Sequence, residues 1–238
     1  MYFIESRGND GQREPRVPFS VAIMTPIASF GGIYSPETLS PLPRDFFADH
    51  LDSSFQALAL ALLQELRIDI DTEVLREAIA LYGNFDDPAN PVPVVKLDDG
   101  QFVLELYHGP TRAFKDMALQ PFGLVLSTLA RQHQQQYLIL TATSGDTGPA
   151  ALETFAGREN VRIACMYPAG GTSDVQRLQM VTVDASNQKT IGIEGNFDDA
   201  QTALKTLLSS DSFNRRLKQL GVSLSAANSV NFGRIIFQ

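Results

Sequence analysis

The sequence predicts an α/β fold built around a parallel sheet. In the second part of the chain, short β-prone runs alternate with segments of helical periodicity. Such alternation is typical of parallel strands with helices on both faces of the sheet. The composition is that of a globular protein, because 44% of the 238 residues are hydrophobic and 19% are charged.

The first part of the chain is expected to differ. Residues 1–44 are rich in Gly and Pro, which predicts turns and short extended pieces. Two helices should follow, one over about 45–67 and one that opens at Asp71 and ends at Gly83. A proline-rich loop comes next. We therefore predict one domain over residues 1–90 and the first part of an α/β domain over residues 91–238.

The second part gives the alternating pattern. The expected strands are 92–97, 102–106, 137–142, 161–167 and 189–194, and the expected helices lie near 115–134, 147–156, 173–183 and 198–209. A further helix is expected at the end of the sequence. Ligands of such sheets bind beyond the carboxyl ends of the strands. The chemistry should therefore lie in the loops after Leu106, Thr141 and Tyr167.

Charge and composition exclude several classes of protein. The net charge is -8 and no segment clusters Lys and Arg, so nucleic acid is not an expected partner. No apolar run approaches the ~18 residues of a membrane helix. Cys165 is the only cysteine, which excludes internal disulfides and favours a buried structural thiol. No spacing of His, Asp and Glu suggests a metal site. With no secretory signal at the start, we expect a cytoplasmic protein.

The first candidate loop spans residues 108–116. Gly109-Pro110 forces a turn and a helix is expected after Asp116, so Lys115 falls at a helix amino terminus. The helix dipole disfavours a cation there by roughly 0.3–1 kcal/mol and favours the neutral amine that forms Schiff bases. Asp116 is expected to be a charge partner of the first helical turn. The alternative is an ordinary surface lysine whose amine lies in water.

The second candidate loop spans residues 143–148, between a strand and a helix. Its glycines permit close approach of a ligand, and the N–H groups at the helix start form an anion cradle. Thr143, Ser144 and Thr147 add hydroxyl donors. Asp146 opposes an anion, so it should cap the helix or face another part of the ligand. The alternative is a tight turn whose side chains only cap the helix.

The third candidate segment lies near the end of the sequence. Asn228, Ser229, Asn231 and Arg234 are expected at one helix start. Amide, hydroxyl and guanidinium donors together suit a phosphate group. The alternative is helix capping beside a solvated arginine.

Taken together, these segments resemble threonine synthases. The loop from His108 to Asp116 is similar to the family's cofactor-lysine motif, and 141–148 is similar to its substrate-binding loop. The segment 228–234 is similar to its substrate-phosphate segment. Further similar segments are 6–8, 31–37, 175–180 and 196–200, so the resemblance covers nearly the whole chain.

The resemblance implies a fold-type II enzyme, like the tryptophan synthase β subunit, with a three-layer architecture and pyridoxal 5'-phosphate (PLP) as cofactor. Such an enzyme converts O-phospho-L-homoserine and water into L-threonine and phosphate. Carried over by position, Lys115 would bind PLP covalently, with Phe114 near its ring and Asp146 near its hydroxyl side. The substrate carboxylate would be held by Thr143, Ser144 and Thr147, and the substrate phosphate by Asn228, Ser229, Asn231 and Arg234.

The family continues well past residue 238, and its later part supplies the loop for the cofactor phosphate. We therefore expect the fold to be incomplete at the carboxyl terminus and this chain to be an inactive fragment. Two alternatives stay open. One is a threonine synthase-like phospho-lyase that eliminates phosphate from amino-acid phosphates, and the other is a non-catalytic remnant. The sequence makes no prediction about the oligomeric state.

Overall fold

A computed structural model describes residues 1–25 and 27–226 of the chain. The first part contains β1 (Tyr2–Glu5), β2 (Val17–Pro18), α1 (Phe19–Met24), η1 (Ser29–Gly31), β3 (Tyr34–Pro36), η2 (Ala48–His50), α2 (Phe55–Glu65), α3 (Thr72–Ala80) and η3 (Leu81–Asn84). The second part contains β4 (Val94–Asp98), β5 (Gln101–Leu104), α4 (Asp116–Gln132), β6 (Gln136–Ala142), α5 (Thr147–Phe155), β7 (Val161–Pro168), α6 (Asp174–Val181), β8 (Gln188–Ile193), α7 (Phe197–Ser209), α8 (Asp211–Gln219) and β9 (Val222–Ala226).

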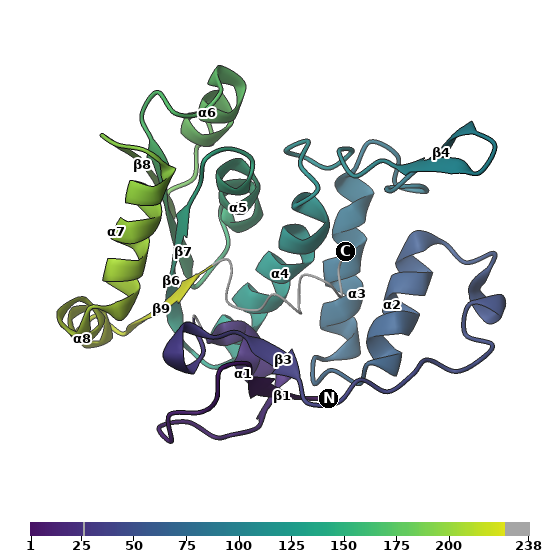
Figure 1. Cartoon of the computed structure of the whole chain (residues 1–238), viewed down its shortest axis with the longest axis horizontal. Coiled ribbons are helices and arrows are strands. Elements are labelled where there is room, and N and C mark those ends of the chain that lie inside the picture. Colours follow the sequence, from purple (N-terminus) through teal and green to yellow (C-terminus); the bar gives the residue numbers. More distant parts are fainter. Residues whose placement is uncertain (26, 227–238) are drawn as a thin grey trace.

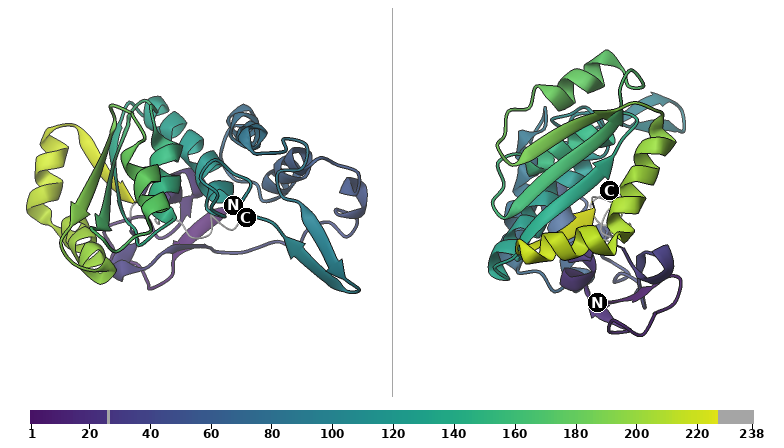
Figure 2. Two further views of the ribbon diagram at one scale, coloured as in Figure 1. Left: turned by 90° about the horizontal axis from the view of Figure 1, so that it is seen from above. Right: turned by 90° about the vertical axis from the view of Figure 1, so that its left-hand side faces the viewer.

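The centre of the second part is a four-stranded parallel sheet in the order β8-β7-β6-β9. Its register places Ile139 of β6 between Ile163 of β7 and Ser225 of β9. Helices α7 and α8 cover one face, and α5 with α4 behind it covers the other (Figures 1 and 2). The predicted α/β fold and its three layers are therefore confirmed.

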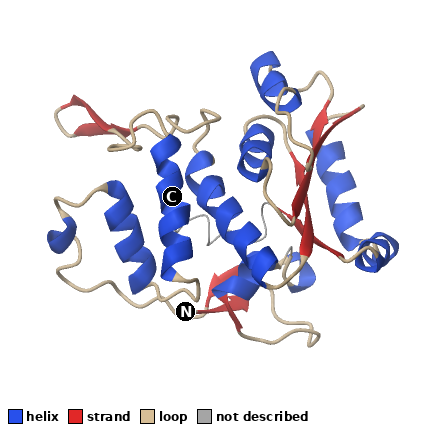
Figure 3. Cartoon of the chain, turned by 180° about the vertical axis from the view of Figure 1, so that it is seen from behind, coloured by secondary structure: helices blue, strands red, loops and turns tan. Residues whose placement is uncertain are grey.

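One part of the strand prediction was wrong. The runs 92–97 and 102–106 were expected in the parallel sheet, but β4 and β5 form an antiparallel hairpin that pairs with no other described strand. Figure 3 shows this hairpin well apart from the sheet. Its turn contains Asp99 and Gly100, and Gly100 has a φ of +77°. An Asp-Gly pair between two β-prone runs is a hairpin signal, because the glycine adopts the positive φ that the turn requires.

The helix expected over about 45–67 is interrupted. The chain forms the short η2 and then begins α2 at Phe55. The interruption follows from Ser54, whose hydroxyl accepts a hydrogen bond from the backbone N–H of Ala57 at 3.2 Å and so caps a new helix. The next helix, α3, begins where it was predicted, because the Asp71 carboxylate accepts from the N–H of Glu73 at 2.7 Å.

Two elements near the end were not predicted, namely α8 and β9. Strand β9 extends the sheet beside β6 and includes Ser225 and Ala226. The proposed phosphate ligands Asn228, Ser229, Asn231 and Arg234, and the helix expected there, lie outside the described residues.

Helix α4 lies between two hydrophobic cores. Its residues Met117, Ala118, Val125 and Leu129 pack with β1, α1, α2 and α3. Residues Leu119, Leu126 and Ala130 of the same helix pack with α5, β6 and β7. The domain boundary near residue 90 stays a prediction, and the two cores share the helix that follows it.

A proline inside α4 explains one buried contact between the two parts of the chain. Pro121 has no N–H to donate to the carbonyl of Met117, one helical turn before it. The hydroxyl of Tyr82 donates to that carbonyl instead, at 2.7 Å. Tyr82 is 1% exposed, so this bond satisfies an acceptor that water does not reach.

Within the described residues, no helix is both long and apolar enough to cross a membrane.

Candidate functional site

The loop that carries Lys115 is closed on itself by Asp116. This carboxylate is fully buried and accepts hydrogen bonds from the backbone N–H of Thr111 at 2.8 Å and from its hydroxyl at 2.7 Å. A Cβ on Gly109 would lie 2.5 Å from the Asp116 side chain, so glycine is required there for this close approach. Asp116 lies in the first turn of α4, and its hydrogen bonds to Thr111 fix the path of the loop into the helix.

Burial has an electrostatic consequence for Asp116. It raises the pKa of the carboxyl above its ordinary value, because desolvation outweighs the opposing hydrogen bonds from Thr111.

Lys115 points at the second candidate loop. Its Nζ lies 2.8 and 2.9 Å from the two carboxylate oxygens of Asp146 and 4.3 Å from the centre of the Phe114 ring. The side chain is only 16% exposed, so the alternative of a solvated surface lysine is wrong. The Lys115 amine therefore faces a carboxylate and lies at the amino terminus of α4.

The second loop is held by Thr143, which is buried at the end of β6. Its hydroxyl donates to the carbonyl of Gly145 and accepts from the N–H groups of Gly145 and Gly148, each at 3.0 Å. The hydroxyl predicted to hold a substrate carboxylate therefore braces the loop in this structure. Gly148 packs against it, since a Cβ there would lie 2.5 Å from Thr143 Cγ2.

The other residues of this loop face outward. Asp146 precedes α5 without capping it and pairs with Lys115, so the first of its two expected roles is excluded. Ser144 is exposed and Thr147 half-buried, and neither hydroxyl has a partner among the described residues. These two hydroxyls are the ones available to a ligand.

Helix α6 contacts both loops, an arrangement that the sequence did not predict. The Gln179 side chain donates from Nε2 to the carbonyl of Thr111 at 3.1 Å. The Gln176 carboxamide lies against Gly145, where a Cβ would come within 3.0 Å of both Oε1 and Nε2. The sequence signals were Ser173, an N-cap that marks where the helix begins, and the family-like segment 175–180, which contains both glutamines.

These groups surround an open cleft with a volume of about 470 Å³. Its lining residues are Thr111, Arg112, Ala113, Phe114, Asp146, Ser173, Val175, Gln176 and Gln179. In Figure 1, α6 lies beyond the carboxyl end of the sheet, next to α5, where ligands of parallel sheets bind.

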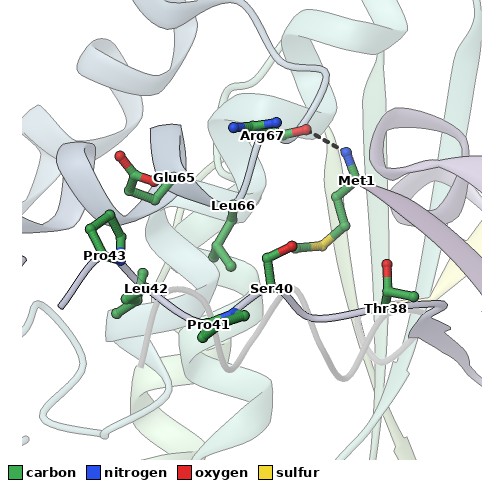
Figure 4. A pocket seen from close by; sticks show the side chains of 9 residues that line it. All are labelled: Met1, Thr38, Ser40, Pro41, Leu42, Pro43, Glu65, Leu66 and Arg67. Atoms are coloured by element: carbon green, nitrogen blue, oxygen red, sulfur yellow. Dashed lines mark hydrogen bonds between the residues drawn. The ribbon is translucent and has the colours of Figure 1, made fainter.

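A second hollow, with a volume of about 340 Å³, lies between the segment 38–43 and the end of α2 (Figure 4). The amino group of Met1 donates to the carbonyl of Arg67 there, at 2.6 Å. None of its lining residues belongs to the Lys115 loop or the 143–148 loop. It is therefore not part of the candidate site.

His108, at the start of the Lys115 loop, is held by two carboxylates. Its Nε2 lies 2.8 Å from Glu105 and its Nδ1 lies 3.2 Å from Asp86, which also pairs with Arg112. Since a carboxylate accepts at both nitrogens, the doubly protonated ring is favoured. The hydrogen bond to Glu105, followed by the one to Asp86, raises the pKa of His108 above its ordinary value.

Comparison with known proteins matches the chain to threonine synthases. The chain is 37% identical to threonine synthase from Pseudomonas aeruginosa, with the match covering 100% of this chain and 49% of the relative. It superposes on the crystal structure of PLP-bound threonine synthase from Brucella melitensis with a TM-score of 0.86 and 35% identity, over 99% of this chain and 49% of that one. The whole chain is thus similar to about half of a threonine synthase.

The match also includes a threonine synthase-like protein, and it covers only part of each relative. The chain is 33% identical over its full length to threonine synthase-like 2 from Rattus norvegicus, of which it covers 48%. The chain thus spans about half the length of the curated relatives it matches, and it fits the amino-terminal portion of threonine synthases. No protein-family model matches it. The fold predicted from the resemblance is confirmed by the structural match.

Cys165 is the buried structural thiol that the sequence indicated. It is 0% exposed in β7, with its Sγ 3.8 Å from the Sδ of Met180. Burial raises its pKa to about 12, which keeps the sulfur protonated and unreactive at neutral pH.

Proposed function

We propose that this chain forms the lysine-bearing part of a PLP-dependent threonine synthase, which converts O-phospho-L-homoserine and water into L-threonine and phosphate. One observation carries the proposal. The Lys115 amine lies largely out of water between Phe114 and Asp146, at the edge of a cleft that two strand-to-helix loops and α6 surround. An ordinary surface lysine keeps its amine in water.

The residues present fit PLP. The cleft, of about 470 Å³, is within the range of about 300–1,000 Å³ for small-molecule sites. Phe114 is 44% exposed beside the lysine and offers an aromatic face to the cofactor ring. When bound, PLP supplies an electron sink for negative charge at the α-carbon of an amino acid.

The chain's own groups then have distinct roles. Lys115 would attach the cofactor and hold or move a proton at Nζ. Asp146 holds Nζ in place through its two oxygens before attachment. Ser144 and Thr147 would donate to the substrate carboxylate, while Thr143 keeps their loop in shape. The substrate phosphate is assigned to Asn228, Ser229, Asn231 and Arg234 on the basis of the sequence resemblance alone.

The test is a PLP titration of the purified chain, followed by borohydride reduction and mass mapping of the modified lysines. We expect one saturable adduct, at Lys115, that Lys115→Ala abolishes. Lys96→Ala is the matched control, because Lys96 also lies 2.8 Å from an aspartate, Asp99, but is 56% exposed on the hairpin. Labelling spread over surface lysines, or equal loss in both variants, would refute the proposed cofactor site.

A second candidate is a phospho-lyase that eliminates phosphate from an amino-acid phosphate without making threonine. The chain matches threonine synthase-like 2 from rat at 33% identity, close to the 37% of its match to the synthase from Pseudomonas aeruginosa. The products separate the two in a protein extended to the length of the relatives: loaded with PLP and given O-phospho-L-homoserine, it releases threonine under the first proposal and a keto acid under the second. Phosphate release alone does not distinguish them.

A further inference from the structure

We propose that Gln176 is a substrate-binding residue of the Lys115 site, where its carboxamide N–H donates to the α-carboxylate of the amino-acid substrate. This inference rests on the proposed function, which puts the substrate in the cleft beside Lys115. It adds a residue from α6 to a site that the sequence resemblance confines to the loops.

The first step concerns how the carboxamide is oriented. Ser173 caps α6 by accepting from the backbone N–H of Gln176 at 3.3 Å, and its hydroxyl donates to Gln176 Oε1 at 3.0 Å. The acceptor end of the amide is therefore occupied. The donor end, Nε2, has no acceptor among the described residues, although the residue lines the cleft.

The second step concerns where that donor lies. A Cβ on Gly145 would come within 3.0 Å of Gln176 Nε2, so the amide occupies the space that any other residue at 145 would fill. The neighbours of Gly145 in the chain are Ser144, whose hydroxyl is exposed, and Asp146, whose carboxylate holds the Lys115 amine. The carboxamide thus lies over the loop assigned to the substrate carboxylate.

The third step is chemical. The substrate amino group must reach the point where Lys115 is attached, and the α-carboxylate is one carbon away from that nitrogen. Asp146 repels a carboxylate there, so donors are needed to offset it. Of the other donors in the cleft wall, Arg112 is paired with Asp86 and Gln179 donates to Thr111. Among the side-chain nitrogens of the described residues that line the cleft, the Gln176 amide is the one that donates to no described group.

The test compares two probes on the PLP-loaded chain. O-phospho-L-homoserine carries the carboxylate, and 3-aminopropyl phosphate is the same molecule without it. Binding of each is followed by the absorbance change of the bound cofactor. We expect Gln176→Ala to weaken O-phospho-L-homoserine about tenfold and Gln176→Glu to weaken it further by repulsion. Both variants should change the affinity for 3-aminopropyl phosphate less than twofold.

Gln219→Glu is the matched control, since Gln219 ends α8, is exposed and undergoes the same change of charge. It should bind both probes like the unaltered chain. Unchanged affinity of the Gln176 variants for O-phospho-L-homoserine, or an equal loss for both probes, overturns the inference while the Lys115 adduct leaves the proposed function standing. Absence of that adduct in the unaltered chain overturns both.

Discussion

Replacing Gly148 with alanine tests whether the second loop is as tightly packed as the structure indicates. The added Cβ would lie 2.5 Å from Thr143 Cγ2, 2.6 Å from Met180 Sδ and 3.0 Å from Cys165 Sγ. All three neighbours are buried, and the Thr143 methyl is held in place because its hydroxyl makes three hydrogen bonds. Overpacking of this kind costs about 1–3 kcal/mol, and with two contacts this short we expect about 2–3 kcal/mol.

The assay is urea unfolding followed by circular dichroism, with the free energy of unfolding taken from the midpoint at constant slope. Gly83→Ala is the matched control, because a Cβ there meets no atom within 4 Å. It should change stability by less than about 1 kcal/mol, toward greater stability. If Gly148→Ala unfolds at the same urea concentration as the unaltered chain, the loop is not packed as described.

A second substitution locates the source of the cost. Thr143→Ser removes the methyl that lies 2.5 Å from the new Cβ and keeps the hydroxyl that braces the loop. In a double-mutant cycle the two changes together should therefore cost less than their sum, by about 1 kcal/mol. Strict additivity would place the strain at Met180 instead of at Thr143.

Three further predictions concern stability. Tyr82→Phe should cost about 1–3 kcal/mol in urea unfolding, because it leaves the buried carbonyl of Met117 without a donor; no loss would mean that water replaces the hydroxyl. Burial raises the pKa of Asp116, so the folded chain holds this proton more tightly than the unfolded chain, and stability should fall as pH rises from the ordinary aspartate pKa through the raised value. Asp116→Asn should remove that slope, and an unchanged slope would contradict the assignment. The pKa of His108 is also raised, so the stability that its protonated ring contributes should be complete below the ordinary histidine pKa and lost as pH rises through the raised value. His108→Gln should therefore flatten the pH dependence of the thermal unfolding midpoint across that window.

Much of the fold could be predicted from the sequence because local signals and tertiary packing agree there. The strands β6, β7 and β8 and the helices between them follow from periodicity and from the cap at Ser173, and α3 follows from its cap at Asp71. The hairpin was assigned to the wrong sheet because β-propensity does not identify the partner strand. The Asp99-Gly100 pair was the available signal. Helix α8 was missed although Ser210 caps it.

The site was predictable residue by residue but not as an arrangement. The motif around Lys115 and the loop from Thr143 to Gly148 could be chosen from residue type and position. Their contact could not, since Lys115 and Asp146 are 31 residues apart and meet only because α4 and α5 pack together. The proposed contribution of Gln176 depends on Gly145. From the sequence, this glycine was expected to leave space for a ligand, but in the structure the Gln176 side chain occupies that space.

Because α4 is a wall of both hydrophobic cores, the position of Lys115 depends on the integrity of each. A core mutation on the α3 side, far from any ligand, would reach the site through the same rigid helix as one on the α5 side. Hydrogen exchange of the α4 amides should therefore report global opening of the chain. A part of the chain that contained only one of the two cores would leave one face of α4 exposed to water, and with it the lysine that the helix positions.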